Sequence, residues 1–183
     1  MKLILASASP RRKELLRYIT EDFTVRVSNA DETVPNGLTP EETVQYLSRL
    51  KAGAVWHGDP EETVVASDTI VVIDGKILGK PHSEEEARSM LRTLSGRTHT
   101  VFTGVCVKTA GRERVFAERT EVTFYPLTEE EIRGYVATGE PMDKAGSYGI
   151  QGKGSLLVKK IDGDFYNVMG LPVAALSRVL SRL

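Results

Sequence analysis

The pattern of apolar and polar positions predicts helices that alternate with β-strands along the chain. Runs rich in β-branched residues have strand length, and helices are predicted where apolar residues recur at helical spacing after a capping residue. The predicted strands are Lys2–Ala6, Phe23–Val27, Val64–Ile73, Lys76–Leu78, Thr98–Lys108, Arg114–Tyr125 and Ser155–Ile161. The predicted helices are Pro10–Leu16, Thr39 to about Trp56, Ser83–Leu94, Thr128–Ala137 and Leu171–Leu183.

Two turn-forming dipeptides indicate hairpins between neighbouring strands. Asp74-Gly75 is typical of tight hairpin turns, and Ala110-Gly111 separates two long strand-like segments. Hairpins rule out a purely parallel sheet, so we expect an α/β fold with a mixed sheet, either three-layered or two-lobed. A length of 183 residues favours a single domain with one core, and no linker or repeat marks a boundary. Two lobes around a cleft are compatible with this length.

Composition and charge restrict the partners that the chain can bind. Hydrophobic residues make up 40% and charged residues 27%, as in folded globular domains. Lys and Arg number 24 against 25 Asp and Glu, so no long-range field attracts nucleic acid or an anionic membrane, and phosphate binding must be local. The N-terminal apolar run is too short for a signal peptide or a membrane span, so we expect a cytoplasmic protein. The single cysteine, Cys106, excludes disulfides and cysteine metal sites, and its apolar neighbours predict a buried, inert thiol.

The first candidate site is the segment Ser7–Lys13, in which two hydroxyl residues precede a helix start and three cations follow. The backbone N–H groups of a helix start favour phosphate, and arginine adds forked donors. Cations at this end oppose the helix dipole, and such an unfavourable local choice often marks function. An ordinary helix cap with solvated cations explains the same pattern, so the motif alone leaves both interpretations open.

The second candidate is Asp68, which lies in the middle of the β-branched strand predicted at Val64–Ile73. An isolated buried charge would cost several kcal/mol, so this carboxylate must be paired, bound to a metal or turned toward a cleft. A structural ion pair or an edge-strand position is the alternative to a functional role.

The third candidate is the glycine-rich segment Asp143–Gly154, where glycines allow close backbone approach to a ligand. Lys144, Gln151 and Lys153 supply charge and amide groups in it, although a mobile surface loop has the same composition. The segment matches neither a Walker A motif nor a dinucleotide fingerprint. These residues together point to an enzyme that acts on a phosphorylated small molecule, and they do not identify the bond that is cut.

Other polar residues give weaker signals. Glu32, Lys51 and Lys80 are, taken singly, ordinary solvated charges. The three histidines are too scattered for a metal cluster, and no Ser-His-Asp spacing supports a nucleophilic triad.

Several motifs in register resemble those of the Maf proteins. They are Leu5–Arg12, Ser67–Thr69, Gly79–Pro81, Leu94–His99, Asp143–Gly146, Tyr148–Gly152 and Gly170–Pro172. Their order and spacing match from Lys2 to about Leu176, which is nearly the whole chain. Ser67 is a departure, because many relatives carry alanine there, but Asp68 is retained.

The resemblance implies an elongated α/β fold with a mixed sheet, flanking helices and a central cleft, related to that of the inosine triphosphate pyrophosphatases. It also implies hydrolysis of a nucleoside triphosphate to the monophosphate and pyrophosphate with a divalent cation, Mg²⁺ or Mn²⁺. Asp68 matches the catalytic proton acceptor, and Glu32 and Asp68 match the metal site. The positions expected to bind substrate are Ser9, Arg11, Arg12, Lys51, Thr69, Lys80, Lys144 and Gln151.

Substrate choice is expected to depend on Arg11, Thr69 and Gln151, which match the branch that prefers dTTP and UTP. CTP and modified pyrimidine nucleotides are compatible with that branch, and removal of non-standard nucleotides is the role it implies. The alternatives are a housecleaning enzyme for purine or methylated GTP nucleotides and a non-enzymatic regulator of septum formation. The sequence leaves open the physiological nucleotide, the metal and the oligomeric state, with a homodimer among the options.

Overall fold

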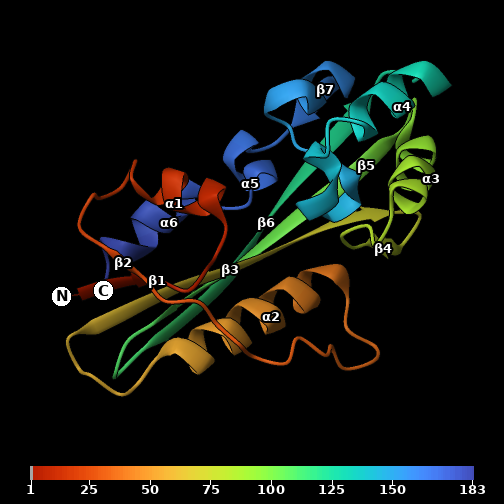
Figure 1. Cartoon of the computed structure of the whole chain (residues 1–183). Helices are drawn as coiled ribbons and strands as arrows, with labels where there is room; N and C mark the ends of the chain where they lie inside the picture. The colour runs from red at the N-terminus through yellow and green to blue at the C-terminus, as the bar shows by residue number, and fades with distance from the viewer. Residues whose placement is uncertain (1) are drawn as a thin grey trace. The chain divides into compact units, whose positions relative to one another are not determined.

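The computed structural model describes residues 2–183 and contains a sheet of seven strands with helices around it (Figure 1). The strands are β1 (Lys2–Leu5), β2 (Thr24–Val25), β3 (Glu62–Ile73), β4 (Lys76–Leu78), β5 (Thr98–Lys108), β6 (Glu113–Phe124) and β7 (Val158–Asp162). The α-helices are α1 (Pro10–Leu16), α2 (Pro40–Val55), α3 (Glu84–Leu94), α4 (Glu129–Val136), α5 (Phe165–Met169) and α6 (Val173–Leu180). Three 3₁₀ helices follow α4: η1 (Glu140–Asp143), η2 (Ala145–Ser147) and η3 (Gly152–Leu157).

The sheet is mixed, as the sequence predicted. Its strand order is β2-β1-β3-β5-β6-β7, and β4 pairs with β3 outside this path. Strand β1 runs parallel to β2 and β3, whereas β4 is antiparallel to β3 and β7 is antiparallel to β6. The two antiparallel pairs confirm that a purely parallel sheet was correctly excluded.

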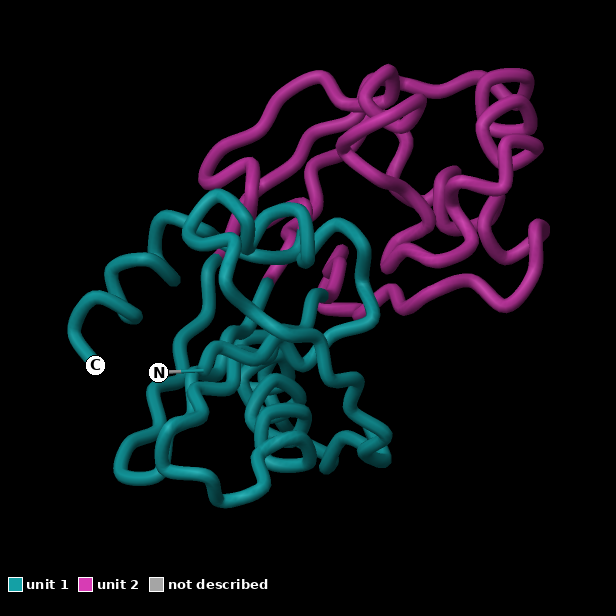
Figure 2. Tube along the Cα trace, turned by 60° about the vertical axis from the view of Figure 1, so that its left-hand side comes forward, with its two compact units in different colours: residues 1–69, 103–118, 170–183 teal, residues 70–102, 119–169 magenta. Residues whose placement is uncertain are grey.

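The chain divides into two compact units (Figure 2). Unit 1 comprises the chain up to Thr69, Thr103–Glu118 and Gly170–Leu183, and unit 2 comprises Ile70–Phe102 and Arg119–Met169. Strands β3, β5 and β6 each contribute residues to both units. The expectation of one functional domain stays a prediction.

Unit 1 is layered because alternate residues of its strands point to opposite faces of the sheet. One face is buried against α2 through a cluster of small and branched apolar side chains. The cluster contains Ile4, Ala6, Ala52, Val55, Val64, Ala66 and Cys106. Helices α1 and α6 lie on the opposite side of these strands (Figure 1). The Cys106 thiol is fully buried, and burial raises its pKa to about 12, which confirms the predicted inert thiol.

A glycine sets how closely α2 approaches the sheet. A side chain at Gly104 of β5 would bring its Cβ within 2.2 Å of the Val44 carbonyl oxygen of α2. Only glycine allows the backbones of helix and strand to meet this closely. Helix α2 itself begins with a capping box, in which Thr39 and Glu42 bond each other's backbone N–H groups, as its sequence suggested.

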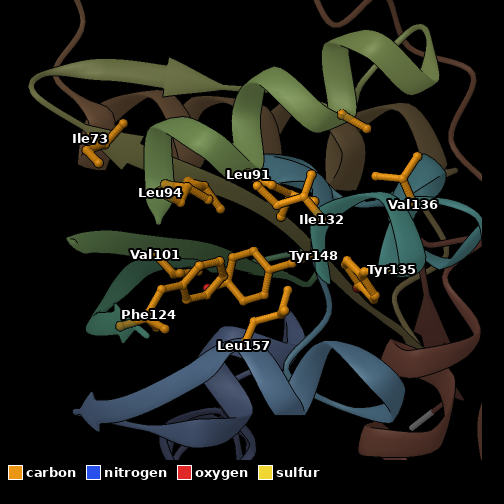
Figure 3. Close-up of a cluster of buried hydrophobic side chains, with 13 residues drawn as sticks. Ile73, Leu91, Leu94, Val101, Phe124, Ile132, Tyr135, Val136, Tyr148 and Leu157 are labelled. Atoms are coloured by element: carbon orange, nitrogen blue, oxygen red, sulfur yellow. The ribbon is translucent and has the colours of Figure 1, made fainter. Parts of the chain in front are cut away.

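Unit 2 has its own apolar cluster, in which helices α3 and α4 contribute Leu91, Leu94 and Ile132 (Figure 3). The His99, Phe124 and Tyr148 rings meet edge to face in this cluster, with centroids 4.7–5.3 Å apart. The His99 Nε2 atom shares a 2.7 Å hydrogen bond with the Tyr148 hydroxyl. Its Nδ1 atom is buried and has no partner among the described residues. The imidazole is therefore held in a site that favours its neutral form.

Several predicted boundaries were wrong. Strand β2 spans only Thr24–Val25, and β7 begins at Val158 because Ser155–Leu157 belongs to η3. The closing helix is α6, Val173–Leu180, and α5 was missed. These errors fall in short elements, where tertiary contacts outweigh local propensity. Within residues 2–183 no helix is both long and apolar enough to cross a membrane.

The buried histidine predicts a pH dependence of stability. Burial lowers the pKa of His99 to about 4, whereas an unfolded histidine titrates near about 6.5. Between these values the unfolded chain binds more protons, so the free energy of unfolding should fall as the pH drops from about 6.5 to about 4. The loss should be on the order of 3 kcal/mol. Urea unfolding at several pH values should show this loss in the wild type and in the exposed-histidine control His82→Gln. In His99→Gln the loss of unfolding free energy between these pH values should be smaller. If this variant showed the same pH dependence as the wild type, His99 would not be its cause.

Candidate functional site

The candidate site of unit 1 is built around the end of β3 that extends past β1. Strand β1 ends at Leu5, opposite Val65, so Ser67, Asp68 and Thr69 continue beyond the end of that neighbour. Alternation along the strand sends the Asp68 side chain to one face and the Ser67 and Thr69 side chains to the other. Two groups of polar side chains therefore border this segment, one on each face.

The first group is a carboxylate, an ammonium and a second carboxylate. The Lys51 Nζ atom of α2 lies 2.6 Å from Asp68 Oδ1 and 3.1 Å from Glu32 Oε2. The side chains of Lys51 and Asp68 are 13% and 12% exposed, whereas that of Glu32 is 52% exposed. Asp68 is thus paired, which is one of the three outcomes that the sequence argument allowed. The partner is a cation 17 positions away, which no local pattern could identify.

The position of Lys51 follows from the packing of α2. Lys51 lies seven residues after Val44, two helical turns along, and therefore on the same face of the helix. Val44 is the residue whose backbone contacts Gly104, so this face is the one pressed against the sheet. The close approach at Gly104 thus directs the ammonium of Lys51 toward β3.

The second group is centred on Arg12 of α1. Its Nε donates to the Gly170 carbonyl oxygen at 2.9 Å, and its Nη2 donates to the Thr69 hydroxyl at 3.0 Å. Its Nη1 donates to the Ser7 hydroxyl at 3.4 Å. Ser67 also donates to the Gly170 carbonyl, at 3.1 Å. Arg12 therefore ties the loop after β1 to β3 and to the start of the last segment of the chain.

The environment of Arg12 is electrostatically mixed. Burial lowers the pKa of its guanidinium; the charges of Asp68 and Glu32 oppose this shift, and Arg11 adds to it. The carboxylates on one face of β3 and the arginines of α1 thus lie within range of each other's fields. An arginine side chain has five N–H donors, and three of those of Arg12 are used in bonds within unit 1.

Helix α1 begins as its sequence predicted. Ser9 is the N-cap, its hydroxyl accepting from the backbone N–H of Arg12, and Pro10 occupies the first turn. The Ser9 backbone N–H in turn donates to the Ser7 hydroxyl at 3.2 Å. Ser9 is therefore a helix cap, the interpretation that the motif left open, and it lies beside the Arg12 cluster.

The remaining predicted residues, Lys80, Lys144 and Gln151, belong to unit 2. The segment after β4 meets the glycine-rich segment where the Gly146 N–H donates to the Gly79 carbonyl at 3.0 Å. The Lys144 Nζ donates to the Glu140 carbonyl at 2.5 Å and to Asp143 at 2.7 Å, so this ammonium has internal partners. Lys80 and Gln151 are exposed, and within residues 2–183 no hydrogen bond involves the Gln151 side chain.

The glycine-rich segment is folded into three short 3₁₀ helices, η1 to η3. Gly146, Ser147, Tyr148 and Gly154 are buried in it. Sequence reasoning missed two residues that hold the segment, Tyr135 and Glu140, because both bond it through backbone N–H groups, which leave no side-chain pattern. It also missed the Gly170 carbonyl as a partner of Arg12. Gly170 has φ +109°, a conformation that favours glycine, so the glycine of Gly170–Pro172 was the available signal for an unusual backbone at this point.

A divalent cation fits the first group by donor chemistry. Among residues 2–183 no cluster of three or more His, Cys, Asp or Glu side chains could hold a metal ion by itself. Glu32 and Asp68 nevertheless bring two carboxylates to the same ammonium, and carboxylate oxygens are the ligands that Mg²⁺ takes together with substrate phosphates.

Comparisons with known proteins agree on one family. The chain is 56% identical to the dTTP/UTP pyrophosphatase of Bacillus velezensis (strain DSM 23117 / BGSC 10A6 / LMG 26770 / FZB42), over 98% of this chain and 95% of that protein. It is 53% identical to the dTTP/UTP pyrophosphatase of Bacillus pumilus (strain SAFR-032), with the same coverage. The Staphylococcus aureus Ham1 protein has a similar fold, with a TM-score of 0.50 at 17% identity over 68% of this chain and 72% of that one. Because the family model described as "Maf-like protein" matches residues 2–183, this chain belongs to the Maf family.

Proposed function

We propose that this chain is a nucleoside triphosphate pyrophosphatase that hydrolyses dTTP and UTP to the nucleoside monophosphate and pyrophosphate. The main support is that relatives more than half identical, over almost the full length of both chains, bear the name dTTP/UTP pyrophosphatase. The buried carboxylate Asp68, held by Lys51 and bordered by Arg12, supplies the chemistry that such a reaction requires. The family match over residues 2–183 favours one functional domain.

Asp68 is the proton acceptor in this proposal. Water that attacks the α-phosphorus must lose a proton, and a carboxylate within hydrogen-bonding reach can accept it. The ion pair with Lys51 offsets the cost of burying the carboxylate charge and fixes its direction. The contact with Lys51 is made through Oδ1 of Asp68, so Oδ2 is suited to accept from the water.

The cations stabilise the leaving pyrophosphate. Negative charge grows on the bridging oxygen and on the β- and γ-phosphates as the bond to the α-phosphorus breaks. Arg11, Lys51 and Lys80 supply positive charge for these oxygens in the proposal. Arg12 contributes its charge as well, while its bonds within unit 1 keep the guanidinium fixed. An arginine held in this way loses little side-chain entropy when the phosphate binds.

Glu32 and Asp68 are the residues that would hold Mg²⁺ or Mn²⁺. When bound, such a cation neutralises phosphate oxygens and lowers the pKa of coordinated water. The Glu32 side chain is half exposed and therefore open to a ligand from solvent, whereas Asp68 is buried in the strand. Lys51 separates the two carboxylates and prevents their mutual repulsion before substrate is present.

Gln151 reads the base in this proposal, with Arg11 and Thr69 as further specificity positions. One amide acceptor and two donors suit the O4 and N3–H edge of uracil or thymine. The Thr69 hydroxyl is already bonded to Arg12 and Thr103, so Thr69 acts on specificity by fixing Arg12. Lys144 supports the segment from within, through its bonds to Glu140 and Asp143.

The assignment of Asp68 is tested by Asp68→Asn, which removes charge and basicity but little volume. The kcat for UTP should fall by at least ~10²-fold, the scale expected when a general base is lost. The matched control is Glu62→Gln, because Glu62 also lies on β3, and its side chain is 9% exposed and paired, in this case with Arg26. The control should lose stability and keep its turnover. Wild-type turnover in a folded Asp68→Asn protein would rule out the assignment.

The metal site is tested by chelation and by a change at Glu32. EDTA should abolish activity, and Mg²⁺ or Mn²⁺ should restore it, because oxygen ligands suit these cations. Glu32→Gln should raise the Mg²⁺ concentration needed for half-maximal activity by at least about tenfold. Asp31→Asn is the control, since the Asp31 carboxylate bonds to Thr33 in the same loop. Full turnover after exhaustive chelation would show that the reaction needs no metal.

The base contact is tested by Gln151→Ala with UTP, dTTP and GTP. Loss of a hydrogen-bond partner at a buried base edge should lower kcat/KM for the pyrimidines by about tenfold to a hundredfold, corresponding to ~1–3 kcal/mol. The kcat/KM for GTP should change little, so the preference for UTP and dTTP over GTP should narrow. Products are measured in the same assay as pyrophosphate and orthophosphate. An unchanged preference, or orthophosphate as the first product, would be inconsistent with this account.

A further inference from the structure

The carboxylate of Glu140 binds the last part of the glycine-rich segment of unit 2. Its Oε1 accepts from the Gly154 N–H at 3.1 Å and from the Tyr135 hydroxyl at 3.0 Å. Its Oε2 accepts from the Lys153 N–H at 3.1 Å. The Tyr135 hydroxyl in turn accepts from the Gly149 N–H at 3.0 Å. Glu140 and Tyr135 thus bind the segment Gly149–Gly154 at both of its ends.

The two ends of this segment also meet each other. A Cβ at Gly154 would lie 2.0 Å from the Gly149 carbonyl oxygen and 2.7 Å from the Tyr135 hydroxyl. A Cβ at Gly152, where φ is +63°, would lie 2.9 Å from the Glu140 carboxylate. Only glycine fits at these positions, so the segment closes tightly on the carboxylate.

Gln151 lies at the centre of this closed segment. On one side, Gly149 two positions before it is bonded to Tyr135, and on the other side Lys153 and Gly154 are bonded to Glu140. The Gln151 side chain itself is exposed. Hydrogen bonds to an ionised carboxylate are about twice as strong as neutral ones. Burial would raise the pKa of Glu140, but the N–H groups of Gly154 and Lys153 and the Tyr135 hydroxyl lower it on balance, so the carboxylate is ionised when it binds the segment.

We propose that Glu140, acting with Tyr135, is a positioning residue that sets the nucleotide preference by fixing the backbone on which Gln151 is presented. This inference rests on the proposed function, because it takes Gln151 as the residue that reads the base. Glu140 itself touches no substrate. Its role is to remove the conformational freedom of Gly149–Gly154, a segment whose glycines would otherwise make ordering on substrate binding costly.

The central variant is Glu140→Gln, which keeps the size of the side chain. An amide can accept at its oxygen only, so its NH₂ group must face a backbone N–H or the Tyr135 hydroxyl that the carboxylate bonded. We expect kcat/KM for UTP to fall and the preference for UTP over GTP to narrow by about tenfold. Tyr135→Phe preserves the ring and removes two hydrogen bonds of the hydroxyl, the one that it accepts from the Gly149 N–H and the one that it donates to Glu140. Because Glu140 keeps its bonds to Lys153 and Gly154 in this variant, the preference for UTP over GTP should narrow less than in Glu140→Gln.

The matched control is Glu131→Gln in the same unit. The Glu131 carboxylate completes the capping box of α4 by bonding the Thr128 N–H and hydroxyl, and it has no bond to the glycine-rich segment. This variant should lower the stability of the protein and leave the preference for UTP over GTP at the wild-type value. An equal narrowing in the control would show that the effect of Glu140→Gln is a general loss of stability, and would overturn the proposal.

A double-mutant cycle separates positioning from an independent effect. If Glu140 acts through Gln151, Glu140→Gln should narrow the preference for UTP over GTP when it is introduced into the wild type. Introduced into Gln151→Ala, the same change should cause no further narrowing. Additive effects would overturn the proposal. If Glu140→Gln does not fold, Tyr135→Phe takes its place in the same cycle.

Hydrogen exchange provides a readout that does not depend on activity. Amide exchange at Lys153 and Gly154 should be faster in Glu140→Gln, and at Gly149 in Tyr135→Phe, with no change at these amides in Glu131→Gln. Unchanged exchange in Glu140→Gln would overturn the positioning role. A different result would overturn the proposed base contact: exchange is faster in Glu140→Gln, but Gln151→Ala keeps the wild-type preference for UTP over GTP. The specificity role of Glu140 would then be overturned as well, because it depends on that contact.

Discussion

The buried charge of Asp68 is the constraint on which the arrangement of unit 1 depends. A carboxylate on a side chain that is 12% exposed in a β-branched strand needs a cation, and Lys51 supplies it at 2.6 Å. That cation reaches β3 because α2 lies close to the sheet, and a Cβ at residue 104 would collide with the α2 backbone at Val44. The Asp68–Lys51 ion pair therefore depends on the position of α2, and that position depends on the lack of a side chain at Gly104. Glu32 joins the pair from a loop and makes the cluster acidic overall, which suits a site for a divalent cation.

The opposite face of β3 solves a different problem, the placement of an arginine. Arg12 lies among hydroxyl and carbonyl groups, and three of its donors bond Gly170, Thr69 and Ser7. Because these partners are neutral, the positive charge of the guanidinium is held in place without being cancelled. An anion that approaches this part of unit 1 meets an oriented cation. The carboxylates on the other face of the strand limit the attraction to a short range.

In unit 2 the charged group held by neutral partners is an anion, whereas in unit 1 it is the cation Arg12. Glu140 is a carboxylate whose partners are two backbone N–H groups and a tyrosine hydroxyl, so it orders a segment that has too many glycines to order itself. Tyr148 of this segment packs in the apolar cluster of the unit, where its ring meets those of His99 and Phe124 edge to face. Tyr135 belongs to both the cluster and the polar network, and it connects the packing of the unit to the placement of Gln151.

The sequence by itself determined the alternation of helices and strands, the hairpin at Asp74-Gly75, the cap at Thr39 and the need of Asp68 for a partner, because each depends on residues close together in the chain. It also carried the motifs that placed the chain in the Maf family. Only the tertiary structure decided that the partner of Asp68 is Lys51, that Arg12 bonds Gly170 across 158 positions, and that the glycine-rich segment is folded on Glu140. These contacts join segments distant in sequence or pass through backbone N–H and carbonyl groups. Every residue carries those groups, so no pattern of side chains reveals which of them will meet.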